Sequence, residues 1–338
     1  MTELLKRLCL INGVSGDEDR VREAVIGRIR DHCDELSTDP LGSLIAFKSG
    51  RSAGKKLMVC AHMDEVGFII THINSDGTLS FDEVGGIDPS VVIGRQVKVG
   101  KAGLEGVVGS PAVHNLSKEE REAPPKFSGM TIDIGASSKE EAEKYVSPGD
   151  CAYFSSEFLE MGSRIKSKAI DDRAGCAMMI RLMQEDLPYD TWFVFNVQEE
   201  IGLRGSAASA FTVAPDFALV LEATTAADID GVSGQKKVCS LGGGPVVGFM
   251  DRRTIYDRDL YRLAFDTAKE MGIPCQTKTA VAGGNDAGAI HISGRGVRTL
   301  AVSVPCRYLH SPACVIDRED LENTYALVRE LAGRIPGL

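Results

Sequence analysis

The pattern of apolar and polar positions predicts two helices and then a buried strand in the first sixty residues. Apolar residues recur at helical spacing over residues 3–12 and 18–32, and the polar stretch between them supplies capping residues and first-turn acids. The next apolar run, residues 57–61, is predicted to be a buried strand. That strand leads directly to His62 and Asp64.

The pattern changes over residues 67–163. Short alternating segments, such as "GFIITHIN", "RQVKVG", "GVVGS" and "DCAYFSS", are separated by Gly, Pro and Asp, and Lys139–Tyr145 is the one helix-like piece. This pattern is typical of a small β-rich unit. We therefore expect an inserted domain at 67–163, between residues 1–66 and 164–338 of a larger domain.

After residue 169, helices and strands alternate. Helices are expected after "IDDRAG", after Arg204 and near 256–271, and strands at "TWFVFNV", "FALVLEA" and "TLAVSV". Such alternation predicts an α/β fold with a mostly parallel sheet and helices on both faces. In open sheets of this kind the ligand binds beyond the carboxyl ends of the strands, so functional residues are expected there.

Composition and charge narrow the partners. A length of 338 residues favours one large domain and one smaller domain. A composition of 43% hydrophobic and 25% charged residues is ordinary for a globular protein. The net charge of −10, without a Lys/Arg-rich stripe, argues against a nucleic-acid partner. Nine cysteines without a CxxC spacing favour a reducing compartment. No signal peptide or apolar run of roughly 18 residues is evident, so we expect a cytoplasmic protein that has no membrane partner.

Acid/base and metal-competent residues recur just past strands or at the mouth of a helix. They occur in five segments: His62 and Asp64 in "AHMDEVG", Asp171 and Asp172 in "AIDDRAG", Glu199 and Glu200 in "QEEIG", Glu222 in "LVLEATTAAD", and His310 in "CRYLHSP". Taken singly, the aspartate pair could cap a helix and the glutamate pair could be a solvated turn. A carboxylate after five apolar residues, as in the fourth segment, is costly unless it is paired or metal-bound. Five such placements together favour one shared site.

These residue types suit a pair of divalent metal ions. Two histidines and three carboxylates, one of them bridging, match two ions of the zinc, cobalt or manganese sort. Two ions about 3.5–4 Å apart can hold a hydroxide and polarise a carbonyl, which is hydrolytic chemistry. A carboxylate that is not a ligand must then take the proton of the water. Glu199 and Glu200 can supply one of each, because adjacent side chains on an extended chain diverge.

Six motifs together carry a resemblance to a known family: "AHMDEVG", "IDDRAG", "VQEEIGLRGS", "LEATTAAD", "GGNDAGAIH" and "RYLHSP". Their types and order resemble metallopeptidase family 42, the dodecameric tetrahedral aminopeptidases, which include glutamyl aminopeptidases and proteins once labelled endoglucanase M. The resemblance covers nearly the whole chain. It implies a catalytic α/β domain of the zinc-exopeptidase kind, interrupted by a β-barrel-like domain that is used in dimerisation.

The resemblance also implies roles for single residues. It implies two metal sites that share Asp171, with these ligands: His62, Asp171 and Glu222 for one, and Asp171, Glu200 and His310 for the other. Glu199 would be the general base, and Asp64 would hydrogen-bond and orient the first histidine. Asp172 and Arg173 are not ligands in the family pattern, so they are expected to cap and pack.

The sequence thus predicts a two-metal aminopeptidase that acts on short peptides. Zinc or cobalt is expected, with manganese as a further candidate, and the resemblance implies a homo-oligomer, a dodecamer built from dimers. One alternative is a two-metal deacylase or carboxypeptidase acting on N-acyl amino acids. A glycosidase with two carboxylates would leave the histidines unexplained, and an inactive scaffold would leave every filled ligand position unexplained.

The sequence does not determine which N-terminal residue of the substrate the enzyme prefers. Arg252, Arg253 and Arg298 are candidates for binding acidic side chains, although each also fits a surface charge. Asn285 stands where the family often has Thr, near the expected substrate pocket. The remaining histidines are expected to be core or surface residues: His32, His72, His114 and His291.

Overall fold

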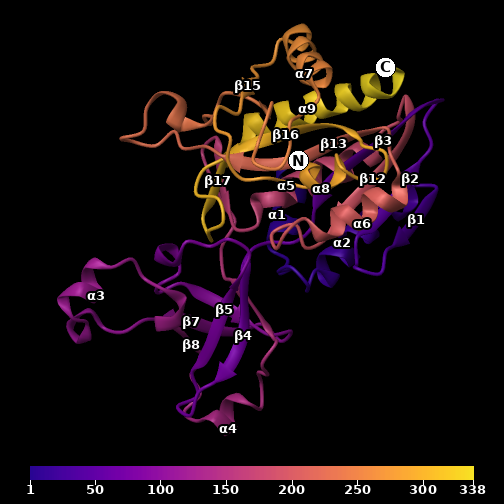
Figure 1. The fold of residues 1–338 in the computed structure, drawn as a ribbon. Helices are drawn as coiled ribbons and strands as arrows, with labels where there is room; N and C mark the ends of the chain where they lie inside the picture. Colours follow the sequence, from indigo (N-terminus) through magenta and orange to yellow (C-terminus); the bar gives the residue numbers. More distant parts are fainter.

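The structure is a computed structural model that describes residues 1–338, the side chain at position 120 excepted. Its centre is an eight-stranded sheet with strand order β1-β2-β12-β3-β13-β16-β14-β15 (Figure 1). The strands have these bounds: β1 Glu35–Thr38, β2 Leu44–Lys48, β3 Ser52–His62, β12 Tyr189–Asn196, β13 Phe217–Thr225, β14 Val246–Val247, β15 Gln276–Thr277 and β16 Arg298–Cys306.

The middle of this sheet is parallel, as the sequence predicted. β3 pairs in parallel with β12 and with β13, and β13 pairs in parallel with β16. Residue pairs such as Val220 with Cys60 and Val220 with Ala301 fix the register. The carboxyl ends of these four strands therefore meet at one edge of the sheet, which is where the sequence places the candidate residues.

Helices cover both faces of the sheet, and β3 shows why. Leu57, Val59 and Ala61 pack in one apolar cluster, whereas Met58 and Cys60 pack in another, because successive side chains of a strand point to opposite faces. The first cluster lies under α1 Thr2–Cys9, α2 Asp19–Ile29, α5 Ile170–Met183, α7 Arg258–Met271 and α9 Arg318–Arg334. The second lies under α6 Arg204–Val213 and α8 Ala287–Ile290.

Helix ends differ slightly from the prediction. α1 and α2 end three residues before the apolar periodicity does, and a short 3-10 turn follows α2 at Arg30–His32. α7 begins at Arg258 rather than 256, because the side chain of Asp257 accepts the first free backbone N–H groups. Further 3-10 turns lie at Pro89–Val91, Val113–Asn115, Phe127–Gly129, Gly234–Lys237 and Ile335–Gly337.

A closed six-stranded barrel lies below the sheet in the view of Figure 1. Its strands run in the order β4 Gly67–Ile73, β5 Leu79–Val84, β8 Thr131–Asp133, β7 Leu104–Gly109, β6 Gln96–Val99 and β9 Cys151–Phe154. Phe68 fills its interior, with edge contacts to Phe81 and Phe154. Two short helices, α3 Lys118–Glu122 and α4 Lys139–Ala142, lie outside it. The expected β-barrel-like unit is therefore present.

A small antiparallel sheet joins the two units. It consists of β10 Leu159–Met161, β11 Arg164–Ser167 and β17 Cys314–Asp317, in that order. β11 leads into Asp171, and β17 follows His310. Two candidate residues that are far apart in sequence are thus brought to one place by the pairing of these strands.

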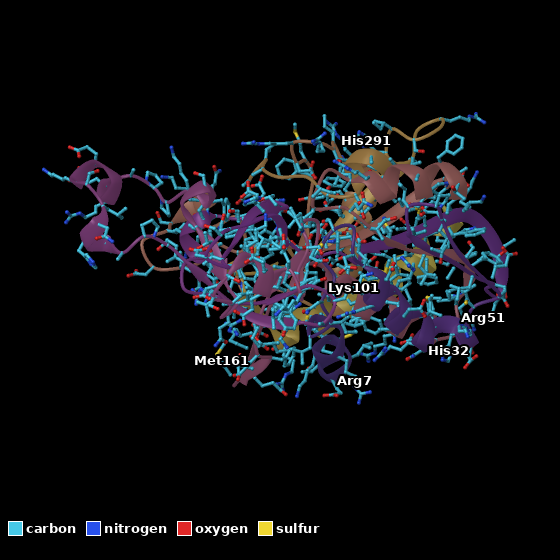
Figure 2. The ribbon with its side chains drawn as sticks, turned by 90° about the horizontal axis from the view of Figure 1, so that it is seen from below. Arg7, His32, Arg51, Lys101, Met161 and His291 are labelled. Carbon is cyan, nitrogen blue, oxygen red and sulfur yellow. The ribbon has the colours of Figure 1, made fainter. Side chains whose placement is uncertain are left out.

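The remaining features of the fold are the cysteines, the four other histidines and the lengths of the helices. All nine cysteines are free, and six of them are buried. His32, His72 and His114 are exposed and His291 is partly buried, and Figure 2 shows His32 and His291 on different sides of the molecule. Within the described residues, no helix is long and apolar enough to cross a membrane.

Candidate metal centre

The seven residues expected to act as metal ligands, general base or orienting group gather at the carboxyl edge of the parallel strands. His62 ends β3, Glu222 lies near the end of β13, and Glu199 follows β12. Asp171 stands at the start of α5 and His310 lies between β16 and β17. Each of the first three residues, and Asp171 as well, is more than nine-tenths buried. The site is therefore built from strand ends and from the segments that follow them, all held in place by the sheet.

Two groups of three residues each present ligand atoms within 4.8 Å of one another: His62, Asp171 and Glu222, and Asp171, Glu200 and His310. The two carboxylate oxygens of Asp171 face different histidines. Oδ1 lies 3.2 Å from Nε2 of His62, and Oδ2 lies 3.5 Å from Nε2 of His310. Each histidine also has a glutamate oxygen nearby, 3.5 Å from His62 and 3.3 Å from His310. A carboxylate shared in this way has the geometry of a bridge.

Backbone carbonyls orient both histidine rings. Nδ1 of His62 donates to the carbonyl of Asp64 at 3.1 Å, and Nδ1 of His310 donates to the carbonyl of Gly86 at 2.7 Å. A ring that donates through Nδ1 has its Nε2 lone pair free for the site. Gly86 comes from the segment between β5 and β6, so the barrel portion of the chain also supports the site.

The start of α5 explains the paired aspartates. Asp171 and Asp172 have non-helical backbone angles and a cis peptide bond between them. The Asp172 side chain accepts the N–H of Gly175 at 2.8 Å and so caps the regular part of the helix. A Cβ at Gly175 would lie 2.3 Å from that carboxylate, which accounts for the glycine. Arg173 is fully buried and donates to the backbone carbonyl of Leu8 in α1.

Asp64 has a wider role than the sequence suggested. Its carboxylate lies 3.4 Å from Nδ1 of His62, but it also accepts the backbone N–H groups of Glu199 at 3.0 Å and Glu200 at 3.1 Å. The hydroxyl of Ser15 donates to the same carboxylate at 2.6 Å. One buried aspartate thus fixes both the histidine and the loop that carries the two glutamates.

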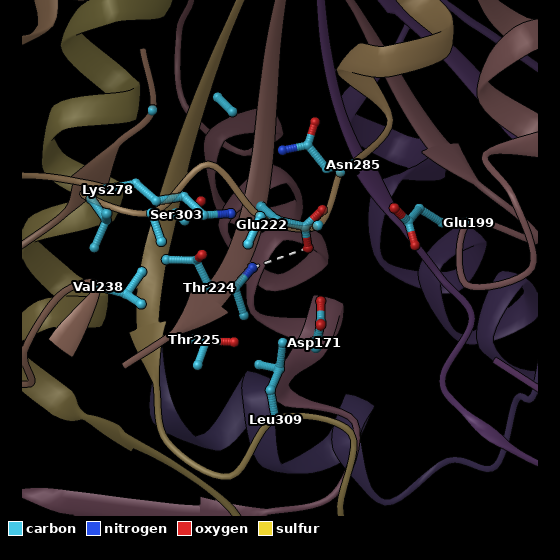
Figure 3. Close-up of a pocket in the computed structure, with 18 of the residues that line it drawn as sticks. Asp171, Glu199, Glu222, Thr224, Thr225, Val238, Lys278, Asn285, Ser303 and Leu309 are labelled. Atoms are coloured by element: carbon cyan, nitrogen blue, oxygen red, sulfur yellow. Dashed lines mark hydrogen bonds between the residues drawn. The ribbon is translucent and has the colours of Figure 1, made fainter. Parts of the chain in front are cut away.

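The loop turns so that the two glutamates face different partners. Gln198 has a φ of 56°, and its N–H donates to the buried Glu18 at 3.1 Å. Glu200 faces His310, whereas Glu199 lies outside both groups of three and lines the cavity. Figure 3 shows Glu199 apart from Glu222 and Asp171, to the right of both. Sequence reasoning missed Ser15 and Glu18, because they carry no metal-binding motif.

The buried carboxylates of the site need positive charge nearby if they are to ionise. Burial raises the pKa values of Glu199 and Glu222 well above the usual range and that of Glu200 to about 7. Burial opposes protonation of His310, yet Asp171 and Glu200 raise its pKa to about 10. So many acids cannot all ionise together in a buried site unless cations offset them. The oxygen and nitrogen donors fit borderline divalent ions.

A cavity of about 310 Å³ adjoins these residues. Figure 3 shows its far wall, with Val238, Thr224 and Ser303, and also the N–H of Ala223 donating to Glu222. Asn285 lines the cavity and donates to the hydroxyl of Tyr256 at 3.0 Å, so it holds part of the wall.

The three arginine candidates do not line this cavity. Arg298 pairs with Asp257, and the other two, Arg252 and Arg253, are exposed. Lys278 does line it and was missed, because no motif surrounds it.

Comparison with known proteins gives the family. The M42 glutamyl aminopeptidase family matches residues 42–327. A putative aminopeptidase of Acetivibrio thermocellus is 41% identical over 98% of both chains. The aminopeptidase of the archaeon Desulfurococcus kamchatkensis has a similar structure, with a TM-score of 0.94 at 35% identity over 98% of this chain and 94% of that one.

A Pyrococcus horikoshii TET1 peptidase, described as assembling into a tetrahedron or a large octahedral shell, matches with a TM-score of 0.87 at 36% identity, over 98% and 99% of the two chains. These matches confirm the resemblance and the α/β fold with a barrel. They also favour peptide hydrolysis over the deacylase and glycosidase alternatives. The chain belongs to the M42 glutamyl aminopeptidase family and is a peptide hydrolase of the aminopeptidase kind.

Proposed function

We propose that this aminopeptidase uses two divalent metal ions to remove N-terminal residues from short peptides. The observation that carries the proposal is Asp171, whose two oxygens face two different histidines while Glu199 stands outside both groups. His62 and Glu222 would complete one site with Asp171, and Glu200 and His310 the other. Zinc or cobalt suits these donors, and manganese is a further candidate.

The ions would supply electrophilic chemistry. When bound, they polarise the carbonyl of the scissile peptide bond and make the attacking water more acidic. They would also neutralise the buried carboxylates of Glu200 and Glu222, whose raised pKa values reflect burial without a counter-charge.

The protein's own residues would handle the proton. Glu199 would accept a proton from the attacking water at its carboxylate and deliver it to the departing amine. Burial raises the pKa of Glu199, which makes its carboxylate a stronger proton acceptor than that of an exposed glutamate. Asp64 would hold the Glu199 backbone in place through its N–H.

The chain is also proposed to form a homo-oligomer, a dodecamer built from dimers. The support is the likeness to the TET1 peptidase and the separate barrel, which stands away from the sheet. Residues 67–163 would carry dimer contacts, while residues 1–66 and 164–338 would carry the ligands. Light scattering at micromolar concentration tests this part, and a monomer alone would contradict it.

Amino-acid anilides test the reaction itself. The holoenzyme should hydrolyse anilides that have a free α-amine and should not hydrolyse the same anilides after acetylation of that amine. Elemental analysis of the active protein should give two metal ions per chain. Faster hydrolysis of the acetylated compounds would favour a deacylase, and one ion per chain would contradict the two-metal assignment.

A further inference from the structure

A buried ionic cluster adjoins the metal site. It consists of three charged residues that have no role in the proposed reaction, Glu65, Lys168 and Arg173, and each is at most 3% exposed. None of the three lines the larger cavity beside the metal site. Glu65 and Lys168 instead line a small cavity of about 10 Å³ together with three metal-site residues, Asp171, Glu200 and His310. The cluster therefore borders the metal site outside the larger cavity.

Lys168 and Glu65 form the first contact within the cluster. Nζ of Lys168 lies 2.6 Å from Oε1 and 2.8 Å from Oε2 of Glu65. Oε1 of Glu65 also accepts the N–H of Gly13 at 3.1 Å. Glu65 stands three residues after His62, and Lys168 stands three residues before Asp171. The ion pair therefore joins the two chain segments that carry these two candidate ligands.

Arg173 joins the same two segments from the other side of Asp171 in the sequence. Its Nε donates to the carbonyl of Met63, the residue after His62, at 2.8 Å. Its Nη1 donates to the carbonyl of Leu8 at 2.6 Å, so it also holds α1 in place. Nε2 of His62 and Oδ1 of Asp171 lie 3.2 Å apart. The two segments are thus joined by side chains on both sides of the aspartate.

Regular backbone hydrogen bonding does not by itself place Asp171. β11 ends at Ser167, Ala169 has a φ of 55°, and Asp171 has a φ of −81° and a ψ of 111°, which are not helical. His62, in contrast, ends β3 and is paired with Asn196 of β12. The position of the aspartate relative to the histidine therefore depends on side-chain contacts, which the ionic cluster supplies.

Stability alone does not account for a buried ion pair of this kind. The attraction between two buried charges scarcely repays the cost of removing them from water, and a well-packed apolar pair is often as stable or more stable. An ion pair with two short N–O contacts does fix a distance and a direction. Residues that surround metal ligands commonly serve to orient them in this way.

We propose that Lys168 and Glu65 are positioning residues, which hold His62 and Asp171 at the spacing that a metal ion between them requires. This inference rests on the proposed function, because that function places an ion there. Only Asp171 of these two ligands also belongs to the second group of candidate ligands. Loss of the ion pair should therefore weaken the binding of one metal ion more than that of the other.

The test removes both charges at once. The double variant Glu65→Leu/Lys168→Met replaces the ion pair by apolar side chains and should keep or raise the Tm of the metal-free protein. Its affinity for one of two zinc ions should nevertheless fall by about 10–100-fold, the range for loss of a residue that orients a metal ligand. Competition with a chelator measures both affinities. Activity on Leu anilide should fall at two zinc ions per chain and recover in part when zinc is in excess.

A milder variant covers the case in which the double variant does not fold. Glu65→Gln keeps the length of the side chain and one oxygen acceptor but loses the charge. The affinity for one zinc ion should fall by about 3–10-fold in this variant, because a neutral acceptor binds the ammonium group of Lys168 less strongly. Zinc affinities equal to those of wild type in folded Glu65→Gln would overturn the proposal.

A matched control removes an ion pair from the same helix, α5. Nη1 of Arg181 lies 2.7 Å from Oε2 of Glu322, and the two side chains are 40% and 42% exposed. The double variant Arg181→Met/Glu322→Leu should leave both zinc affinities within about twofold of wild type. A fall in this control as large as that in the Glu65/Lys168 variant would overturn the proposal, because any change to α5 would then suffice.

The outcomes also separate this inference from the proposed function. A Glu65→Leu/Lys168→Met protein that folds, binds two zinc ions as tightly as wild type and keeps its kcat would overturn the positioning role and leave the two-metal reaction intact. A wild-type protein that binds no zinc, cobalt or manganese would overturn the proposed function itself.

Discussion

The barrel and the sheet-centred unit bury different kinds of side chain. In the barrel, the buried cluster consists of apolar groups such as Phe68, Phe81 and Phe154, and no described charged side chain between residues 67 and 166 is fully buried. The sheet-centred unit buries His62, Glu222 and many other polar groups. Burial of apolar side chains stabilises the barrel. Burial of charged side chains at the carboxyl edge of the sheet lowers the stability of the fold.

The difference follows from the cost of buried charge. An apolar side chain gains free energy when it leaves water, but a carboxylate loses its hydration and needs a partner of opposite charge. At the site, the excess of acids over cations is left for metal ions to offset. The metal-free site is therefore expected to lower the stability of the fold, whereas the apolar core of the barrel is expected to raise it.

Metal removal should have the largest effect. Chelation should abolish anilide hydrolysis, and added zinc or cobalt should restore it, because polarisation of the carbonyl depends on the ions. Chelation should also lower the Tm, because the ions bind the folded state in preference to the unfolded one. Full activity in protein shown by elemental analysis to be metal-free would contradict the proposal.

Phe68→Ala should have the largest effect on stability in the barrel. The side chain is fully buried and its ring lies 5.0 Å from that of Phe81, so truncation leaves a cavity. The expected loss is about 3–5 kcal/mol in the free energy of unfolding, measured with denaturant. The metal content of protein that remains folded should not change. A loss below about 1 kcal/mol would show that the barrel core is loosely packed.

Glu200→Gln should stabilise the metal-free protein, whereas Phe68→Ala should destabilise it. Burial raises the pKa of Glu200 to about 7 from an ordinary value of 4.5, so the folded state favours its protonated form. The corresponding stability is present below pH 4.5 and is lost as pH rises to about 7. At pH 8 the metal-free variant should therefore equal or exceed metal-free wild type by about 1–2 kcal/mol.

The comparison with low pH is the control for that prediction. The advantage of Glu200→Gln should shrink as pH falls toward 4.5, because wild-type Glu200 is then protonated. A variant that is markedly less stable than metal-free wild type at pH 8 would show that the carboxylate is already well compensated by the protein.

Ser15→Ala should have the smallest effect. The hydroxyl of Ser15 donates to Asp64, which in turn accepts the N–H groups of both glutamates. Loss of one of three donors should loosen the loop and lower kcat by about 3–10-fold, with KM and metal content nearly unchanged. Ser15→Thr, which keeps the hydroxyl, is the matched control. An equal fall in both variants would show that packing rather than the hydrogen bond matters.

The sequence predicted the features that depend on local patterns. Strand-end positions identified His62 and Glu222, and the change of pattern at Gly67 identified the β-rich unit. It could not predict contacts made by backbone groups, such as the carbonyl of Gly86 at His310, because a carbonyl has no sequence signature. Nor could it find Ser15 or Lys278, which reach the site only through the long-range pairing of the chain.

The most direct test compares two chemically identical changes at adjacent positions, Glu199→Gln and Glu200→Gln. Glu199→Gln should keep two metal ions per chain and lower kcat by on the order of 10²–10⁴, because only the proton acceptor is lost.

Glu200→Gln should instead bind the second ion weakly and regain part of its activity when the metal is in excess. The decisive measurement is metal content per chain, together with kcat, for both variants. Two ions and near-normal rates in both would contradict the account, and loss of metal in Glu199→Gln alone would reverse the two roles.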